Sequence, residues 1–187
     1  MKKIALDIDG VIFDSENLFR VYSEIYDVDV FKSDNIIDNS EKLFQKRYDW
    51  TEEEKEKFYN KYIYEIIDNS NIVPGADIVL NKLKDKFEFI IVTSRPDPQI
   101  DGINKWLDKM NFNFKIYNND QYKVDRLLSE KVDYVIDDCI DICSNAAENG
   151  IIALYFINNA CNKLYKENVI NVNNWGEIYK YLILNKD

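Results

Sequence analysis

The feature that most constrains the fold is a short apolar run near the start of the chain that ends in two carboxylates. Residues 4–11 read Ile-Ala-Leu-Asp-Ile-Asp-Gly-Val, which predicts a buried strand that stops at a charged loop. Because side chains alternate along a strand, Asp7 and Asp9 can project to the same side while Ile8 turns away. Two carboxylates at a strand end repel each other unless a cation or a proton lies between them. The pattern therefore indicates a functional site rather than part of the core.

Two simpler interpretations of this stretch are an ordinary turn and the start of a calcium-binding loop. A calcium loop that opens with Asp-x-Asp-Gly needs a glutamate at its twelfth position. Counted from Asp7 that position is Leu18, and counted from Asp9 it is Arg20. The calcium loop is therefore excluded, and the turn remains as the alternative.

After residue 70 the sequence alternates between predicted helices and strands. The strands are expected at 87–92, 114–117, 133–136 and 151–156, and the helices at 76–86, 98–110, 121–130, 144–149 and 175–184. Such alternation is typical of an α/β fold with a Rossmann-like, mostly parallel sheet flanked by helices.

Residues 15–70 read as helices without strands. One helix follows Ser15, a short one is expected over residues 40–48, and Thr51-Glu52-Glu53-Glu54 is a capping box that starts another. The apolar residues expected on the inner faces are Leu18, Phe19, Tyr22, Ile25 and Tyr26 before the short helix and Phe58, Tyr62, Ile63, Ile66 and Ile67 after it.

The composition excludes several classes of chemistry and partner. The chain has no histidine, so a Ser-His-Asp or Cys-His mechanism and a His-based zinc hydrolase are impossible. A net charge of −10 argues against a nucleic acid polymer as partner, because its phosphates are held by clustered Lys and Arg. Cys139, Cys143 and Cys161 lack zinc-type spacing and fit reduced thiols.

The sequence also gives expectations for location and assembly. No apolar run is long enough to cross a membrane, and we expect a cytoplasmic protein with no membrane partner. The oligomeric state stays open, with a homodimer as one alternative.

Polar residues follow the ends of predicted strands at three places. They are Asp7 and Asp9, Thr93, Ser94 and Arg95, and Asp137 and Asp138. In open parallel sheets, ligands bind beyond the carboxyl ends of the strands. We therefore expect these residues to converge on one site.

A lysine is expected to balance the negative charge of this site, and three lysines are candidates. Lys131 lies just before the strand that ends in Asp137, about 17 Å from the acids at the usual rise of a strand. Lys115 lies within a predicted strand. Lys123 opens a helix on the side of the carboxyl ends and is therefore preferred.

Together these stretches resemble the motifs of the haloacid dehalogenase superfamily of phosphatases. Residues 4–10 are similar to the first motif, residues 90–93 to the second, Lys123 to the third and residues 135–138 to the fourth. The resemblance spans nearly the whole chain, with the motifs in the expected order.

The resemblance implies a division of the chain into two parts. A core domain would consist of residues 1–14 and 71–187, and a small all-helical cap of residues 15–70 would be inserted after the first strand.

The resemblance also implies phosphate monoester hydrolysis through an aspartyl-phosphate. Asp7 would be the nucleophile and Asp9 the general acid and base, with a raised pKa so that it holds a proton at neutral pH. The residues implied to bind the phosphoryl group are Thr93, Ser94, Arg95 and Lys123. The implied cofactor is Mg²⁺, held by Asp7, Asp137 and the backbone carbonyl of Asp9, with Asp138 bound directly or through water.

The substrate is less constrained than the chemistry. The compact helical insert, the Asp-Ile-Asp-Gly-Val opening and the Ile-Asp-Asp motif are similar to the 5′(3′)-deoxyribonucleotidase branch, which implies a nucleoside monophosphate. The alternatives are a phosphatase of a sugar phosphate or another small metabolite, and a non-catalytic binding protein on the same scaffold. A dehalogenase is disfavoured because its chemistry needs neither the second aspartate nor the metal.

Overall fold

A parallel sheet forms the centre of the computed structural model, which describes residues 1–41, 43–157 and 163–185. Its six strands are β1 (Lys3–Leu6), β2 (Glu88–Val92), β3 (Lys115–Tyr117), β4 (Tyr134–Asp137), β5 (Ile152–Phe156) and β6 (Val169–Val172). Their spatial order is β3-β2-β1-β4-β5-β6, and every pair of neighbours is parallel. The strand order reverses beside β1, which is where an open α/β sheet offers a crevice for ligands.

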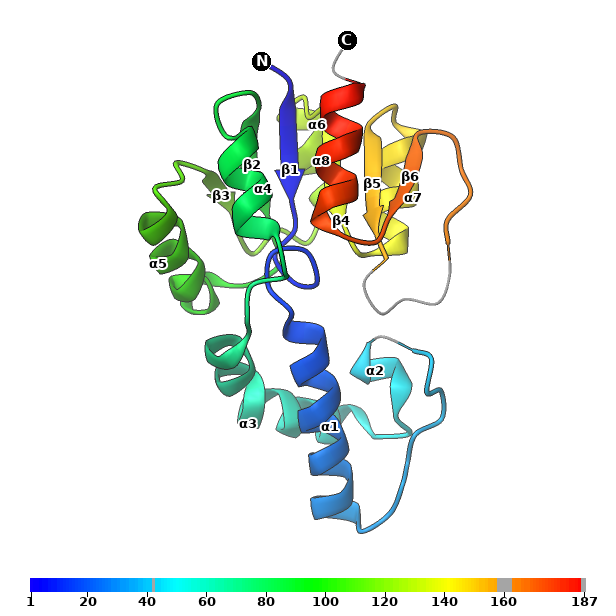
Figure 1. The fold of residues 1–187 in the computed structure, drawn as a ribbon. Helices are drawn as coiled ribbons and strands as arrows, with labels where there is room; N and C mark the ends of the chain where they lie inside the picture. Colours follow the sequence, from blue (N-terminus) through cyan, green and yellow to red (C-terminus); the bar gives the residue numbers. More distant parts are fainter. Residues whose placement is uncertain (42, 158–162, 186–187) are drawn as a thin grey trace.

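Helices cover both faces of this sheet (Figure 1). The elements between and after the strands are α4 (Ala76–Leu83), η1 (Asp97–Gln99), α5 (Asp101–Met110), α6 (Lys123–Ser129), α7 (Ile140–Glu148) and α8 (Trp175–Leu184). The alternation within β1 shows the two layers, because Ile4 and Leu6 pack with α4, α5 and α8, whereas Ala5 packs with α6 and α7. The expected α/β fold with a parallel sheet is therefore confirmed.

Residues 15–70, called the helical segment below, lie beyond the end of the sheet toward which β1 points (Figure 1). The segment contains α1 (Ser15–Phe31), α2 (Phe44–Arg47) and α3 (Glu52–Asn69), and the expected capping box at Thr51 is present. It has an apolar cluster of its own, in which Phe58 is fully buried against Tyr26 and Trp50. The segment thus has an interior separate from the two layers of the sheet.

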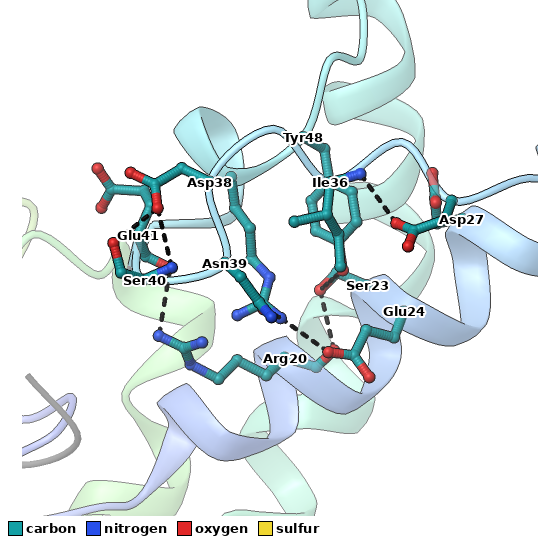
Figure 2. Close-up of polar contacts among 12 residues, drawn as sticks. Arg20, Ser23, Glu24, Asp27, Ile36, Asp38, Asn39, Ser40, Glu41 and Tyr48 are labelled. Carbon is teal, nitrogen blue, oxygen red and sulfur yellow. Dashed lines mark hydrogen bonds and ion pairs between the residues drawn. The ribbon is translucent and has the colours of Figure 1, made fainter.

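Polar contacts hold the connection between α1 and α3 in place (Figure 2). Asp27 is buried, and its carboxylate accepts hydrogen bonds from the Asn35 amide at 2.8 Å and from Trp50 Nε1 at 2.6 Å. Arg20 Nη2 donates to the Glu41 carbonyl oxygen at 3.2 Å. These contacts fix a stretch of backbone that forms little regular structure.

Several local predictions differ from the structure. The helix expected over residues 40–48 spans only Phe44–Arg47. The backbone amide and the hydroxyl of Ser40 both donate hydrogen bonds to the Asp38 carboxylate, and this local turn competes with a helix. Ile25, expected to face inward, is 46% exposed. Strand β6 was not predicted, since its four residues include a polar Asn171 and follow an asparagine-rich stretch.

The described part of the chain also bears on two expectations from composition. Cys139 and Cys143 are free thiols, as expected, and Cys161 lies outside the described residues. Among the described helices, none combines the length and the apolar character needed to cross a membrane.

Candidate active site

Asp7 lies directly after β1 and is held by the sheet itself. Its backbone amide donates to the Ile136 carbonyl oxygen at 3.0 Å, which continues the pairing of β1 with β4 by one residue. The residue is 8% exposed. The sheet therefore fixes a nearly buried carboxylate at the reversal of strand order.

Asp137 and Asp138 bring two more carboxylates to the same place. Asp137 ends β4, is 1% exposed, and accepts a hydrogen bond from the Cys139 amide at 2.8 Å. Carboxylate oxygens of Asp7, Asp137 and Asp138, called the carboxylate cluster below, lie within 4.8 Å of one another. Two strand ends that are far apart in the sequence thus form a single acidic site.

Lys123 balances part of this charge. As the first residue of α6 it places Nζ 2.8 Å from Asp7 Oδ1 and 3.3 Å from Asp137 Oδ2. The other two candidate lysines lie elsewhere, because Lys115 is in β3 beside Tyr117 and Lys131 is exposed. The structure therefore places Lys123, the lysine preferred from the sequence, beside Asp7 and Asp137.

The charges of the cluster are strongly coupled. Burial raises the pKa of Asp7 to about 6, an effect that the positive charge of Lys123 opposes and the negative charge of Asp137 reinforces. Burial alone would lower the pKa of Lys123, but Asp137 and Asp7 outweigh it and the pKa is raised. Lys123 thus stays charged, and a further cation would favour the ionised form of Asp7.

The donor set of the cluster fits a hard divalent cation. Carboxylate oxygens are the ligands that Mg²⁺ prefers, usually a few together with waters. Gly10 makes room for this arrangement, because a Cβ at that position would lie 1.8 Å from Asp138 Oδ2 and its φ of +73° is a conformation that suits glycine.

Thr93 lies at the end of β2, and its neighbours differ in exposure. Its amide donates to the Tyr117 carbonyl at 2.9 Å, and its buried hydroxyl oxygen accepts from the Arg95 amide at 3.2 Å. The hydroxyl hydrogen is then left to donate to another group. Ser94 is exposed and Arg95 is buried, so the two residues expected to bind phosphate beside Thr93 have different surroundings.

Asp9 is in a different environment from the one expected. Arg95 contacts both of its carboxylate oxygens, with Nε 2.8 Å from Oδ2 and Nη2 on Oδ1, and the Ser15 hydroxyl also donates to Oδ1. We call Asp9, Arg95 and Ser15 the arginine cluster. Burial would raise the pKa of Asp9, but the charge and hydrogen bonds of Arg95 and the bond from Ser15 lower it. The sequence argument expected a raised pKa and did not foresee this ion pair.

Three residues of this neighbourhood had no signal in the sequence. Ser15 follows Asp14, the N-cap of α1, and its hydroxyl donates to Asp9. Gln99 is buried and accepts from Arg95 Nη1 through its backbone carbonyl at 3.4 Å, and its side chain meets the Tyr59 hydroxyl. These contacts depend on the course of the loop after β2, for which sequence patterns give no rule.

Two curated proteins are similar to this chain along nearly its whole length. No family model matches the chain. A Halalkalibacterium halodurans protein named "Putative nucleotidase" is 24% identical over 181 residues, covering 94% of this chain and 90% of that protein. A Bacillus subtilis protein, also named "Putative nucleotidase", is 21% identical over 193 residues, covering 100% of this chain and 96% of that protein.

A solved structure matches over almost the same extent. It is described as a hydrolase, a haloacid dehalogenase-like family protein from Streptococcus pneumoniae, and superposes with a TM-score of 0.72 at 16% identity. The match covers 97% of this chain and 98% of that chain. The fold implied by the sequence motifs is therefore confirmed: the chain has a haloacid dehalogenase-like fold.

Proposed function

We propose that this chain is a haloacid dehalogenase-type phosphatase that hydrolyses phosphate monoesters through an aspartyl-phosphate and uses Mg²⁺. The observation that carries the proposal is the carboxylate cluster, with Lys123 bridging Asp7 and Asp137 at two neighbouring strand ends. A non-catalytic binding module has no use for buried carboxylates that repel one another.

Mg²⁺ would be held by the carboxylates of Asp7 and Asp137 and by the backbone carbonyl of Asp9, with Asp138 as a further ligand, direct or through water. The oxygen donors of the cluster support this assignment. When bound, the ion offsets the repulsion between the cluster and a phosphate dianion.

Asp7 would perform the covalent step. One of its carboxylate oxygens attacks phosphorus in line, a P–O bond to Asp7 forms, and the bond from phosphorus to the leaving oxygen breaks. Water then attacks the same phosphorus, the bond to Asp7 breaks, and inorganic phosphate leaves with the carboxylate restored. Lys123 and the Thr93 hydroxyl would donate hydrogen bonds to the transferred group.

Asp9 would carry the two proton transfers. It gives a proton to the leaving oxygen in the first half and takes one from the attacking water in the second half. Before the first transfer the ion pair with Arg95 has to open and Asp9 has to take up a proton from solvent, because a carboxylate held on both oxygens by a guanidinium carries no proton. A phosphate dianion offers Arg95 another partner, and we propose that Arg95 passes from Asp9 to the substrate.

The helical segment would act as a cap over the site. In this proposal residues 1–14 and 71–187 form the core domain and residues 15–70 the cap, which would exclude bulk water during the chemistry. The position of the segment beyond the strand ends supports this role (Figure 1).

A nucleoside monophosphate is the substrate class that we propose. Two curated relatives that align along nearly their whole length carry the name nucleotidase. These names support a nucleotide as the substrate class.

The test is a substrate panel with the purified protein and Mg²⁺. It should include 5′- and 3′-nucleoside monophosphates, ribo and deoxy, together with sugar phosphates. We expect release of phosphate from nucleotides, and loss of release in Asp7→Asn but not in Asp85→Asn, which changes an exposed aspartate after α4. Turnover of sugar phosphates alone would reject the nucleotide assignment, and inactivity on every monoester would reject the phosphatase.

A further inference from the structure

A pair of hydrogen bonds joins the helical segment to the loop that follows β2. The Tyr59 hydroxyl donates to Gln99 Oε1 at 3.3 Å, and Gln99 Nε2 donates to the same hydroxyl oxygen at 3.2 Å. Tyr59 lies on α3 next to Phe58, which is fully buried in the apolar cluster of the segment. Gln99 ends η1 and is 6% exposed. The pair therefore connects two well-packed parts of the molecule.

Gln99 also contacts the arginine cluster. Its backbone carbonyl oxygen accepts a hydrogen bond from Arg95 Nη1 at 3.4 Å. The other side of the guanidinium, Nε and Nη2, holds Asp9. Because a guanidinium is planar and rigid, a carbonyl that fixes one edge also fixes the direction in which the opposite edge points.

We infer that Gln99 is a positioning residue for Arg95, and that Tyr59 sets Gln99, so that the helical segment controls how tightly the site holds phosphate. This inference rests on the proposed function, in which Arg95 exchanges Asp9 for the substrate phosphate. During the exchange Nε and Nη2 change partner while the Gln99 carbonyl retains Nη1. The guanidinium of Arg95 thus stays in position while its anionic partner changes from Asp9 to phosphate. This requires that Tyr59 holds Gln99 in place.

The affinity for inorganic phosphate tests this inference without requiring turnover. Calorimetric titration in Mg²⁺ should show binding about 3- to 10-fold weaker in Tyr59→Phe than in the unaltered protein, the size of one neutral hydrogen bond. The matched control is Tyr64→Phe, which removes a hydroxyl from the same helix at a side chain that is 54% exposed. Equal affinities in the two variants would overturn the inference.

A double-mutant cycle separates positioning from general loosening of the fold. In an Arg95→Lys background, whose ammonium cannot form the same planar contacts, Tyr59→Phe should weaken phosphate binding no further. Additive losses would show that Tyr59 acts by a route other than Arg95, and would contradict the inference.

A second measurement needs no phosphate. The solvent exchange of the Arg95 Nε–H proton, followed by nuclear magnetic resonance and assigned with Arg95→Lys, should be faster in Tyr59→Phe than in Tyr64→Phe. An unchanged rate would overturn the positioning role. If the unaltered protein binds no phosphate, the proposed function fails, and this rate still decides whether Gln99 positions Arg95.

Discussion

Asp7 and Asp9 are separated by one residue at the end of β1, yet they belong to two differently built clusters. The carboxylate cluster around Asp7 comes from two strand ends and Lys123, and burial raises the pKa of Asp7. The arginine cluster around Asp9 comes from loops and the first residue of α1, and Arg95 and Ser15 lower the pKa of Asp9 against the effect of burial.

In the proposed mechanism, this difference gives one short motif two chemical roles. The sheet holds Asp7 among carboxylates that repel one another, which suits the proposed nucleophile and metal ligand. Asp9 is paired with Arg95, which in the proposed mechanism moves to the substrate, and this suits a group that changes its protonation during the reaction. The following predictions test this contrast, from the largest expected effect to the smallest.

The largest effect is expected on turnover. Asp7→Asn should lower kcat by about a thousand-fold or more, because an amide cannot replace a carboxylate nucleophile. Asp9→Asn should also remove most activity but leave metal binding in place. Steady-state phosphate release measures the first effect, and Mg²⁺ titration the second. Comparable activity in Asp7→Asn and Asp85→Asn would contradict the role of Asp7 as the nucleophile.

The next effect is expected on stability, at Gly10, which follows Asp9 and lies against Asp138. Gly10→Ala should lower the free energy of unfolding by about 2 to 4 kcal/mol, since the added Cβ collides with Asp138 and the positive φ disfavours alanine. Gly102→Ala is the matched control, because nothing lies within 4 Å of its Cβ position. Denaturant unfolding measures both, and equal stabilities would contradict the close approach of Asp138 to Gly10.

Metal binding should depend on the carboxylate cluster and not on the arginine cluster. Mg²⁺ at about 100 times its Kd should stabilise the protein by about 3 kcal/mol, seen as a rise in Tm. Asp137→Asn should abolish this rise and Asp9→Asn should preserve most of it, because only the first removes a carboxylate ligand. A Tm that responds to Mg²⁺ equally in both variants would place the ion elsewhere.

The smallest effect is expected in the pH dependence of stability without metal. The folded pKa of Asp7 is about 6 against an ordinary value of 3.8, so the folded state binds more protons than the unfolded state between these values. Stability should therefore fall by about 2 kcal/mol as pH rises through this window. Asp7→Asn should remove the fall and be the more stable protein at pH 7.

The contribution of Asp9 to stability should change with pH in the opposite direction. Its folded pKa is lowered, so its contribution to stability is present above the ordinary pKa of an aspartate and is lost as pH falls below it. Asp9→Asn should therefore weaken the loss of stability in acid. Parallel unfolding curves of the two variants from acid to neutral pH would contradict the assignment of opposite environments.

The sequence predicts the first cluster much better than the second. Asp7, Asp137 and Lys123 follow from strand ends and a helix start, and parallel strands bring such ends together whatever the loops do. Arg95 was expected on the phosphate, but its contact with Asp9 depends on how the chain turns after Thr93. Loop paths of this kind leave no periodic pattern.

The same reason explains the elements of the fold that were missed. The capping box at Thr51 correctly predicts where α3 begins, and the helix expected over residues 175–184 coincides with α8. Strand β6 is held by contacts such as those of the Asn171 side chain with the Leu164 backbone, and α2 is shorter than expected because Ser40 bonds Asp38 instead of joining the helix. Such contacts are invisible until the chain is folded.

The central claim is that Asp7 is phosphorylated during turnover. It is tested most directly by mixing the protein with Mg²⁺ and its best monoester substrate, quenching with acid during the first turnover, and locating the phosphoryl group by mass spectrometry. The account predicts one phosphoryl group on the peptide that contains Asp7, and none in Asp7→Asn. Phosphate release with no phosphorylated Asp7, or with the phosphoryl group on another residue, would contradict it.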